Sequence, residues 1–426
     1  MKTLKISRTA NAKLQNRINM SVVFNYLREN EPTYRARISR DLNISAPAVS
    51  RIIDKLIEDK YVVETEKLRI HSGKRPTQLR INSGKCNVIG IDLVKEKIKV
   101  ALSDFSGKIS STYQGSKISE IVSEEMDIGQ KLIDEVETVI HNYCSEHKQK
   151  PATHNVKAIC VGIPAVIDTA TGFVTDLPLY SSLRDVNLKE RLGEYFDVPV
   201  YVENITRLSA LGEKNYGEGM EYKDIVFIEV SNGIGAGIII DNHLIRGTSG
   251  SAGEIGLSII DTENLGFNVN NKGYLEENAS VEAITEKAAR ELRHGSQTLI
   301  SDYIEDDINK LTPSVVCQAA LKKDEVAQKI ISEIVEVLSI VTLNLILIIN
   351  PQIIVFGGDI CNLPEVKKLF IDPIRQNVTK SIPLELPQMK LSSLGENAGV
   401  VGASFLAIES LLLGEFPYSI DLDLLT

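Results

Sequence analysis

The sequence of 426 residues is poor in the residue types that mark secreted, disulfide-rich and metal-binding proteins. It has no tryptophan, five cysteines and six histidines. The cysteines stand singly, without a Cys-x-x-Cys pair, so we expect small buried thiols in a reducing cytoplasm instead of disulfides. The histidines are dispersed as well, and no cluster has the spacing of metal ligands. We therefore expect neither a metal ion nor another cofactor.

Long apolar runs are also missing. The sequence contains no stretch of about eighteen apolar residues without charge, so it predicts no membrane span. The apolar stretch 337–349 is too short and contains Ser339, Thr342 and Asn344. The N-terminus is basic, but no apolar core or small-residue cleavage site follows it, which argues against a secretory signal. We expect a cytoplasmic protein with no membrane partner.

Charge is unevenly distributed along the chain, whose length predicts two or three domains. Residues 1–85 contain 18 Lys and Arg against 8 Asp and Glu, a net charge of +10. The rest contains 29 basic and 49 acidic residues, a net charge of −20. In an acidic protein, a basic first fifth is typical of a segment that meets a polyanion. A basic tail kept for solubility is the alternative, but this segment has the pattern of a folded domain.

The basic segment has the periodicity of three helices. The first ends near Pro32, which disfavours helix at the residue before it, and a second is expected over 35–42. After a tight turn, 43–45, the third helix runs to about Asp59, with Ser45 as N-cap and Pro47 in its first turn. The apolar positions expected to face the core of the first and third helices are Ile18, Val22, Val23, Tyr26, Leu27, Val49, Ile52, Ile53, Leu56 and Ile57.

Two helices of these lengths around a tight turn predict a helix-turn-helix, whose second helix enters the major groove of DNA. The alternating segments 61–64 and 78–81 predict two strands of a wing, joined by a basic loop, 71–76, that is placed to meet phosphates or the minor groove. Arg51 is expected to read a guanine through a bidentate contact. The expected DNA contacts are Ser45, Ala46, Pro47, Ala48, Ser50, Arg51, Lys55, Lys74 and Arg75.

From residue 86 the pattern changes to buried strands that alternate with long helices, which predicts an α/β fold. Strands are expected at 88–93, 97–103, 158–164 and 353–356, and helices at 123–146 and 324–349, the first with Ser123 as N-cap. Gly-rich stretches lie at 231–237 and 355–359. Taken alone they are weak signals, because glycines after strands serve tight turns more often than phosphate contacts.

In their order, these segments resemble the ROK family (repressors, open reading frames and kinases) over nearly the whole chain. The elements that carry the resemblance are Gly73-Lys74-Arg75-Pro76, Gly90-Ile91-Asp92-Leu93, Gly162-Ile163-Pro164, Val202-Glu203-Asn204, Gly233-Ile234-Gly235-Ala236-Gly237, Gly253-Glu254-Ile255-Gly256, Gly357-Gly358 and Ala398-Gly399-Val400-Val401-Gly402-Ala403. The resemblance implies a two-lobed, actin/Hsp70-like sugar-kinase fold after the winged helix-turn-helix. We expect a DNA-binding domain at 1–82, a first lobe at 83–200 and a second lobe at 201–426, with the C-terminal helix returning to the first lobe.

The resemblance also implies that kinase chemistry is missing. In ROK kinases the general base is the Asp that follows Glu-Asn, and here this position is Ile205, which cannot accept a proton. Where glycines and a threonine shape the phosphate loop of the family, this chain has Val94, Lys95 and Glu96, which block the approach of phosphates. We expect no enzymatic activity.

The structural zinc of the family is expected to be lost as well. Its ligands are a His after Gly-Glu-Ile-Gly and three Cys in a following loop. Here these positions are Leu257, Phe267, Val269 and Tyr274, none of which is a zinc ligand. We expect these apolar and aromatic side chains to pack the loop in place of the metal.

By the same resemblance, Asn204, Glu254 and Glu276 occupy positions whose side chains hydrogen-bond sugar hydroxyls, which suits a polyol effector. We expect these three side chains to line one cleft between the lobes. A Glu254 that braces a loop and a Glu276 on a solvated helix start are the alternatives. Arg207, one turn after Asn204, either binds an anionic group of the effector or is a surface cation.

The sequence therefore predicts a transcriptional regulator, most simply a repressor of carbohydrate-utilisation genes. Its expected partners are a duplex DNA operator, bound as a homodimer or homotetramer, and a small-molecule effector, a sugar or sugar derivative. A ROK sugar kinase with an appended DNA-binding domain is one alternative. An effector-independent DNA-binding protein with a vestigial sensor is the other.

Overall fold

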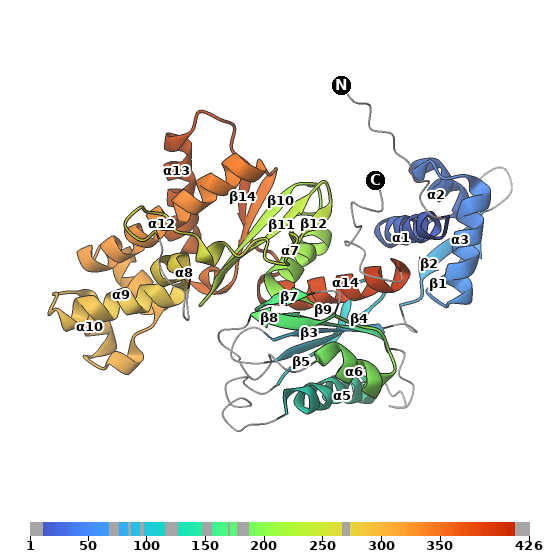
Figure 1. Cartoon of the computed structure of the whole chain (residues 1–426), viewed down its shortest axis with the longest axis horizontal. Coiled ribbons are helices and arrows are strands. Elements are labelled where there is room, and N and C mark those ends of the chain that lie inside the picture. The colour runs from blue at the N-terminus through green and yellow to red at the C-terminus, as the bar shows by residue number, and fades with distance from the viewer. Residues whose placement is uncertain are drawn as a thin grey trace.

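Three units follow one another along the chain (Figure 1). The computed structural model describes residues 12–67, 76–83, 87–93, 98–115, 127–146, 156–168, 171–176, 187–265 and 273–413. The first unit consists of α1 (Ala12–Asn30), α2 (Arg35–Leu42), α3 (Ala46–Glu58), β1 (Val62–Lys67) and β2 (Thr77–Ile81). The two strands pair antiparallel, and Thr33 adds a bridge to Leu79. Three helices followed by a hairpin is the element order of a winged helix-turn-helix.

The second unit is built on a five-stranded sheet. Its strand order is β5 (Ile109–Gln114), β4 (Lys99–Asp104), β3 (Asn87–Asp92), β6 (Val156–Ile163) and β9 (Val200–Asn204). The pairs β5–β4 and β4–β3 are antiparallel, and β3–β6 and β6–β9 are parallel. A hairpin of β7 (Val166–Asp168) and β8 (Phe173–Asp176) follows β6. Residues of α5 (Ile128–Glu146) and α6 (Leu188–Phe196) share a core with one face of the sheet.

The third unit repeats this strand order. Its sheet runs β12 (His243–Ile245), β11 (Ile234–Ile240), β10 (Ile225–Val230), β13 (Ile353–Gly357) and β14 (Gln388–Leu391), again third, second, first, fourth and fifth along the chain. Its outer face is covered by α8 (Tyr274–Ala279), α9 (Val281–Arg293), α10 (Leu299–Ile304), α11 (Pro313–Leu321), α12 (Glu325–Ile349) and α13 (Asp372–Ser381). Single turns of helix, among them η2 (Ile255–Leu257), η3 (Ile308–Lys310), η4 (Asp359–Asn362), η5 (Lys367–Ile371) and η6 (Gly395–Asn397), connect these elements.

Two helices connect the lobes, because each follows a strand of one sheet and packs on the other sheet. α7 (Ile205–Tyr216) leaves the first sheet after β9 and packs on β10 and β11 of the second sheet. α14 (Ala398–Leu413) leaves the second sheet after β14 and packs on β3 and β6 of the first. The two helices also pack against each other, so that they form a double layer between the two sheets (Figure 1).

The central strands of the two sheets, β3, β6, β10 and β13, are buried on both faces, as their unbroken apolar runs predict. Along β10, Val226, Ile228 and Val230 face the outer helices, whereas Ile225 and Phe227 face α7 and α14. The inner core around α7 and α14 continues without a break into the first unit, where it includes residues of α1, α3 and the hairpin. The first unit therefore shares one core with the helices that join the lobes.

Some element boundaries and faces differ from expectation. Val22 is 41% exposed, whereas Phe24, which the helical pattern did not select, is fully buried and meets Phe105 edge-on at 6.2 Å. The helix expected from Ser123 begins at Ile128, where Asp127 accepts the N–H groups of the first turn, and Ser123 itself lies outside the described residues. The expected boundary at 200/201 lies inside β9, which is a strand of the first sheet.

The apolar segment of α12 is longer than the expected stretch 337–349. In the part of the chain that the structure describes, α12 alone is long and apolar enough to cross a membrane by length and composition. Of its most apolar window, 56% is buried inside the protein. Its buried residues belong to the core of the second lobe, which is the role of a central helix in a folded domain.

The cysteines agree with the expectation only in part. Cys160 and Cys317 are buried free thiols, and burial raises the pKa of both, that of Cys317 to about 12. Thiols with raised pKa values are unreactive. Cys361 is partly exposed, so the expectation of burial was wrong for this residue.

Candidate functional site

The helix-turn-helix is held by polar contacts around its turn. Asn43 ends α2 in the left-handed conformation (φ 53°), and the hydroxyl of Ser39 donates to the carbonyl oxygen of Ile44 at 2.6 Å. Arg35, at the start of α2, pairs with Asp54 of α3 at 2.7 Å and with Glu64 of β1 at 2.8 Å. One guanidinium thus links α2, α3 and β1 at the edge of the apolar core that packs the helices together.

The outer face of α3 is small at its start and basic further on. Ser45, Ala46, Pro47, Arg51 and Lys55 are exposed, and Ala48 and Ser50 are partly buried. Ser45 stands at the N-cap as expected, but its side chain makes no capping hydrogen bond, so its hydroxyl can face another partner.

The two cations on this helix differ in what surrounds them. Lys55 pairs with Asp59 at 2.9 Å and with Glu58 at 3.2 Å, and these hydrogen bonds raise its pKa. Arg51 has no ion pair in the part of the chain that the structure describes. Arg51 is therefore the cation on this helix that is prepared for an external anion or a base edge. Residues 68–75, which include Lys74 and Arg75 and all of the expected wing loop except Pro76, lie outside the described residues.

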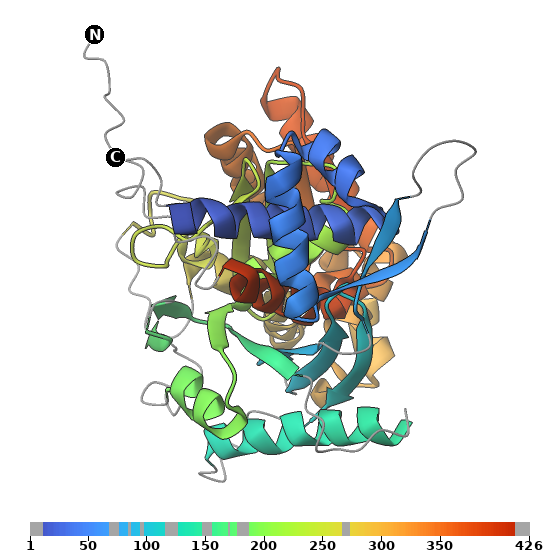
Figure 2. The same ribbon diagram turned by 90° about the vertical axis from the view of Figure 1, so that its right-hand side faces the viewer.

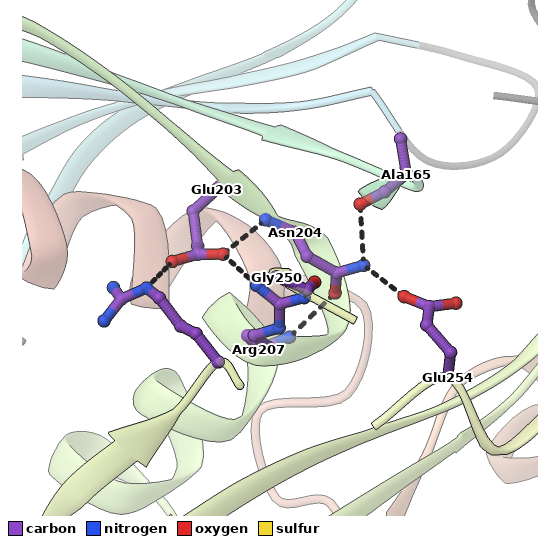
Figure 3. A network of polar contacts seen from close by, with 7 residues as sticks. Ala165, Glu203, Asn204, Arg207, Gly250 and Glu254 are labelled. Carbon is purple, nitrogen blue, oxygen red and sulfur yellow. Dashed lines mark hydrogen bonds and ion pairs between the residues drawn. The ribbon is translucent and has the colours of Figure 1, made fainter. Parts of the chain in front are cut away.

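A second polar site lies where β9 passes into α7. The side-chain oxygen of Asn204 accepts the N–H of Arg207 at 3.2 Å and so caps α7. Its amide nitrogen donates to the carbonyl oxygen of Ala165 at 3.1 Å and to Glu254 at 3.5 Å (Figure 3). Asn204 comes from the first sheet and Glu254 from the second lobe. The structure therefore brings these two predicted residues together across the junction of the lobes.

Glu276 is used differently from the expectation. One carboxylate oxygen accepts the N–H of Ile234 at 3.0 Å, and the other accepts that of Gly273 at 2.9 Å. A Cβ at Gly256 would lie 2.7 Å from Glu276, so the loop that carries Glu254 touches this carboxylate. Both oxygens thus brace backbone, at the start of α8 and at β11. Glu276 stands at a helix start, as the alternative had it, but it is only partly exposed and both of its oxygens accept backbone N–H groups.

Arg207 is neither a surface cation nor an anion receptor that faces a cleft. Its side chain is 1% exposed, and its guanidinium pairs with Glu203 at 2.8 Å and donates to the carbonyl oxygen of Gly250. Arg246 also pairs with Glu203, at 2.6 Å. Both expectations for Arg207 were therefore wrong, because the carboxylate of Glu203 inside the protein takes up its charge.

Glu203 and Arg246 were missed as site residues. Together with Arg207 they tie the segment 246–254 of the second lobe to the end of β9 in the first lobe. A Glu four residues before an Arg is only a weak local signal here, because Glu203 belongs to β9 and Arg207 to the first turn of α7. The pairing with Arg246, 43 residues away, carries no local signal.

Ile205 occupies the position at which the kinases of the resembled family carry their base. Its side chain is 3% exposed and lies against Gly162 of β6, where a Cβ would overlap it. A Cβ at Gly399 of α14 would lie 2.6 Å from the same side chain and 2.7 Å from Asp92. The position is thus a sealed apolar contact between the first sheet and α14.

In the region that resembles the zinc loop of the family, the hydroxyl of Tyr274 joins α8 to the segment around Asp261. Tyr274 is 9% exposed, and its hydroxyl donates to Asp261 and accepts the amide of Asn264 at 3.1 Å. The hydrogen bond from Tyr274 lowers the pKa of Asp261. Leu257 is 51% exposed, so the expectation that it packs the loop was wrong. Phe267 and Val269 lie outside the described residues.

Comparison with known proteins finds relatives over nearly the whole length of the chain. The model of the ROK family matches residues 88–410. A xylose repressor from Caldicellulosiruptor bescii is 30% identical over 94% of this chain and 98% of its own. A glucokinase from Halalkalibacterium halodurans is 28% identical over 75% of this chain and 94% of its own. The solved structure of a ROK family transcriptional regulator, 22% identical, gives a TM-score of 0.78 over 97% of this chain and 99% of its own, and so has the same fold.

Proposed function

The chain belongs to the ROK family, and on this premise we propose that it is a sugar-responsive transcriptional repressor. The observation that carries the proposal is the exposed Arg51 on the second helix of a helix-turn-helix, placed ahead of a two-lobed ROK module. A related glucokinase matches only three quarters of this chain, whereas a related repressor matches nearly all of it. The N-terminal unit is therefore the part of this chain that the related repressor shares and the related glucokinase lacks.

Operator binding is proposed to use two copies of the chain, because a two-fold operator needs two recognition helices. The surface that we assign to the contact is an apolar stripe on α12, formed by Ile340, Leu347 and Ile348, which are 40%, 52% and 77% exposed. These residues recur at helical spacing, and large exposed apolar patches on soluble proteins are usually interaction sites.

Binding to duplex DNA is expected to weaken steeply with salt, because each phosphate contact releases counterions. Arg51→Ala is expected to weaken binding to the specific operator by about 1–3 kcal/mol and to leave non-specific binding nearly unchanged. Electrophoretic or anisotropy titrations with operator and scrambled duplexes measure both. Arg293→Ala, on the surface of α9, removes the same charge far from α3 and serves as the control. An equal loss on all duplexes would make Arg51 a phosphate contact.

Phosphotransfer is expected to be absent, because the base position is the buried Ile205. A coupled assay with ATP and a panel of hexoses, pentoses and amino sugars is expected to stay at background, and a ROK glucokinase run in parallel shows that the assay works. Turnover of this protein that disappears in a Glu254→Gln variant would overturn the assignment and support the kinase alternative.

The effector is proposed to be a neutral polyol that meets Asn204 and Glu254, and D-xylose is the first candidate because several relatives are xylose repressors. Glu254→Ala is expected to weaken D-xylose binding by about 1–3 kcal/mol, since hydroxyls lose an acceptor. Apo DNA affinity should not change. Glu277→Ala on the exposed side of α8 is the matched control. Calorimetry with D-xylose, D-glucose and ribitol separates these outcomes, and no response to any of them favours the vestigial-sensor alternative.

A further inference from the structure

One face of α1 is bound to the two helices that join the lobes. The hydroxyl of Ser21 donates to Glu409 of α14 at 2.7 Å, and the amide of Asn25 donates to the other oxygen of the same carboxylate. One turn further on, Arg28 donates to the hydroxyl of Tyr216, in the last turn of α7, at 2.8 Å. Figure 2 faces this side of the molecule, with α1 in dark blue lying beside α14 in red.

This contact is buried and specific. Glu409 is 4% exposed, burial raises its pKa, and two of its donors come from α1. Arg28 also lies over two aromatic rings, 5.2 Å from the centre of Tyr216 and 5.0 Å from that of Phe405. If α1 tilted away, a buried carboxylate would lose donors and a cation would lose both rings. The contact therefore fixes the orientation of α1 on the lobes.

The other end of α7 lies at the proposed sugar site. Asn204 caps the helix and meets Glu254, and Tyr216 ends it against Arg28. Twelve residues at 1.5 Å each make a rod of about 18 Å between these ends. α14 packs closely along this rod, because Gly212 and Gly402 allow backbone contact between the two helices, where a Cβ on either would overlap the other helix.

We propose that α7, backed by α14, couples the sugar site to the DNA-binding domain, and that Arg28, Tyr216 and Glu409 are the residues that position this domain. The inference rests on the proposed function. A polyol that draws Asn204 and Glu254 together shifts α7 along its axis or turns it. The shift reaches α1 through Tyr216 and changes the distance between the recognition helices of a dimer.

The docking is tested first, without any ligand. Hydrogen exchange of the full-length protein is expected to be at least about fivefold faster in α1 for both Arg28→Ala and Tyr216→Phe than for the wild type. Tyr195→Phe is the matched control, because it removes a hydroxyl that donates to Glu137 at 2.7 Å within the first lobe. Exchange in α1 that is unchanged in both variants would overturn the inference, as would equal acceleration in the control.

The coupling is tested with D-xylose and operator DNA. Arg28→Ala and Tyr216→Phe are expected to bind D-xylose within about twofold of the wild type, while the change in DNA affinity caused by the sugar falls at least about fivefold. If Arg28 and Tyr216 had a purely structural role, the variants would not keep their affinity for D-xylose while losing the change in DNA affinity that the sugar causes. A wild-type response that both variants keep in full would refute the coupling. A wild type that does not respond to the sugar, with faster exchange in the variants, would count against the proposed effector and leave the docking supported.

Discussion

Arg207→Ala is expected to lower the free energy of unfolding by about 3–5 kcal/mol, because it leaves the buried carboxylate of Glu203 with half of its cationic partners. Arg207 and Glu203 are 1% and 0% exposed, so solvent screens their interaction little. The change also releases the carbonyl oxygen of Gly250, and with it the segment that carries Glu254. Arg207→Lys should recover only part of the loss, since an ammonium cannot span both acceptors as the planar guanidinium does.

The measurement is equilibrium unfolding in urea, with the midpoint compared at unchanged slope. Arg40→Ala is the matched control, because Arg40 also pairs with a carboxylate at 2.8 Å but is 71% exposed, and little change is expected there. A loss for Arg207→Ala no larger than that of the control would mean that water reaches Glu203 and that the ionic cluster does not hold the junction.

Gly402→Ala is expected to destabilise the protein by about 3 kcal/mol, although alanine is the better helix former. A Cβ at this position of α14 would overlap the carbonyl oxygen of Leu208 on α7, and backbone cannot turn aside as a flexible side chain can. The two helices would have to separate, which disturbs the inner core that both sheets share.

Gly193→Ala, in the same protein, is expected to have the opposite effect on stability. Gly193 lies inside α6, and the nearest atom to a Cβ there is 3.6 Å away, at ordinary contact distance. This change should stabilise the protein by about 0.5–1 kcal/mol. Thermal unfolding of the two variants side by side tests both expectations. A Gly402→Ala variant as stable as the wild type would show that α7 and α14 can separate with little loss of stability.

Elements with local signals could be predicted from the sequence. The bounds of α2 agree with expectation, and α12 begins after Asp324, whose side chain accepts from Ala327 as an N-cap does. Periodicity and caps act within one or two turns, and such signals are readable in a single chain. The pairing of Asn204 with Glu254 was also foreseen, although only by family resemblance.

What could not be predicted depends on contacts between distant segments. Phe24 is buried because Phe105 and α14 lie against α1, and helical spacing alone selected Val22. The two alternatives weighed for Arg207 did not include an internal ion pair, because the burial of this residue depends on the segment around Gly250, 43 residues away. The wing tip at 74–75, the segment 94–96 and positions 267 and 269 lie outside the described residues, so what was expected of them stays a prediction.

The placement of α14 has a consequence for how the chain is made. A ribosome synthesises α1 early, but Phe405 and Glu409, to which α1 docks, are added about 380 residues later, which takes roughly 20–80 seconds at 5–20 residues per second. Until then the first sheet also lacks the helix that covers its inner face. The nascent chain therefore exposes the inner apolar face of the first sheet until α14 has been synthesised. We expect chaperones to bind this surface. An mRNA truncated before the codons of α14 would encode a DNA-binding domain without the helix against which α1 packs.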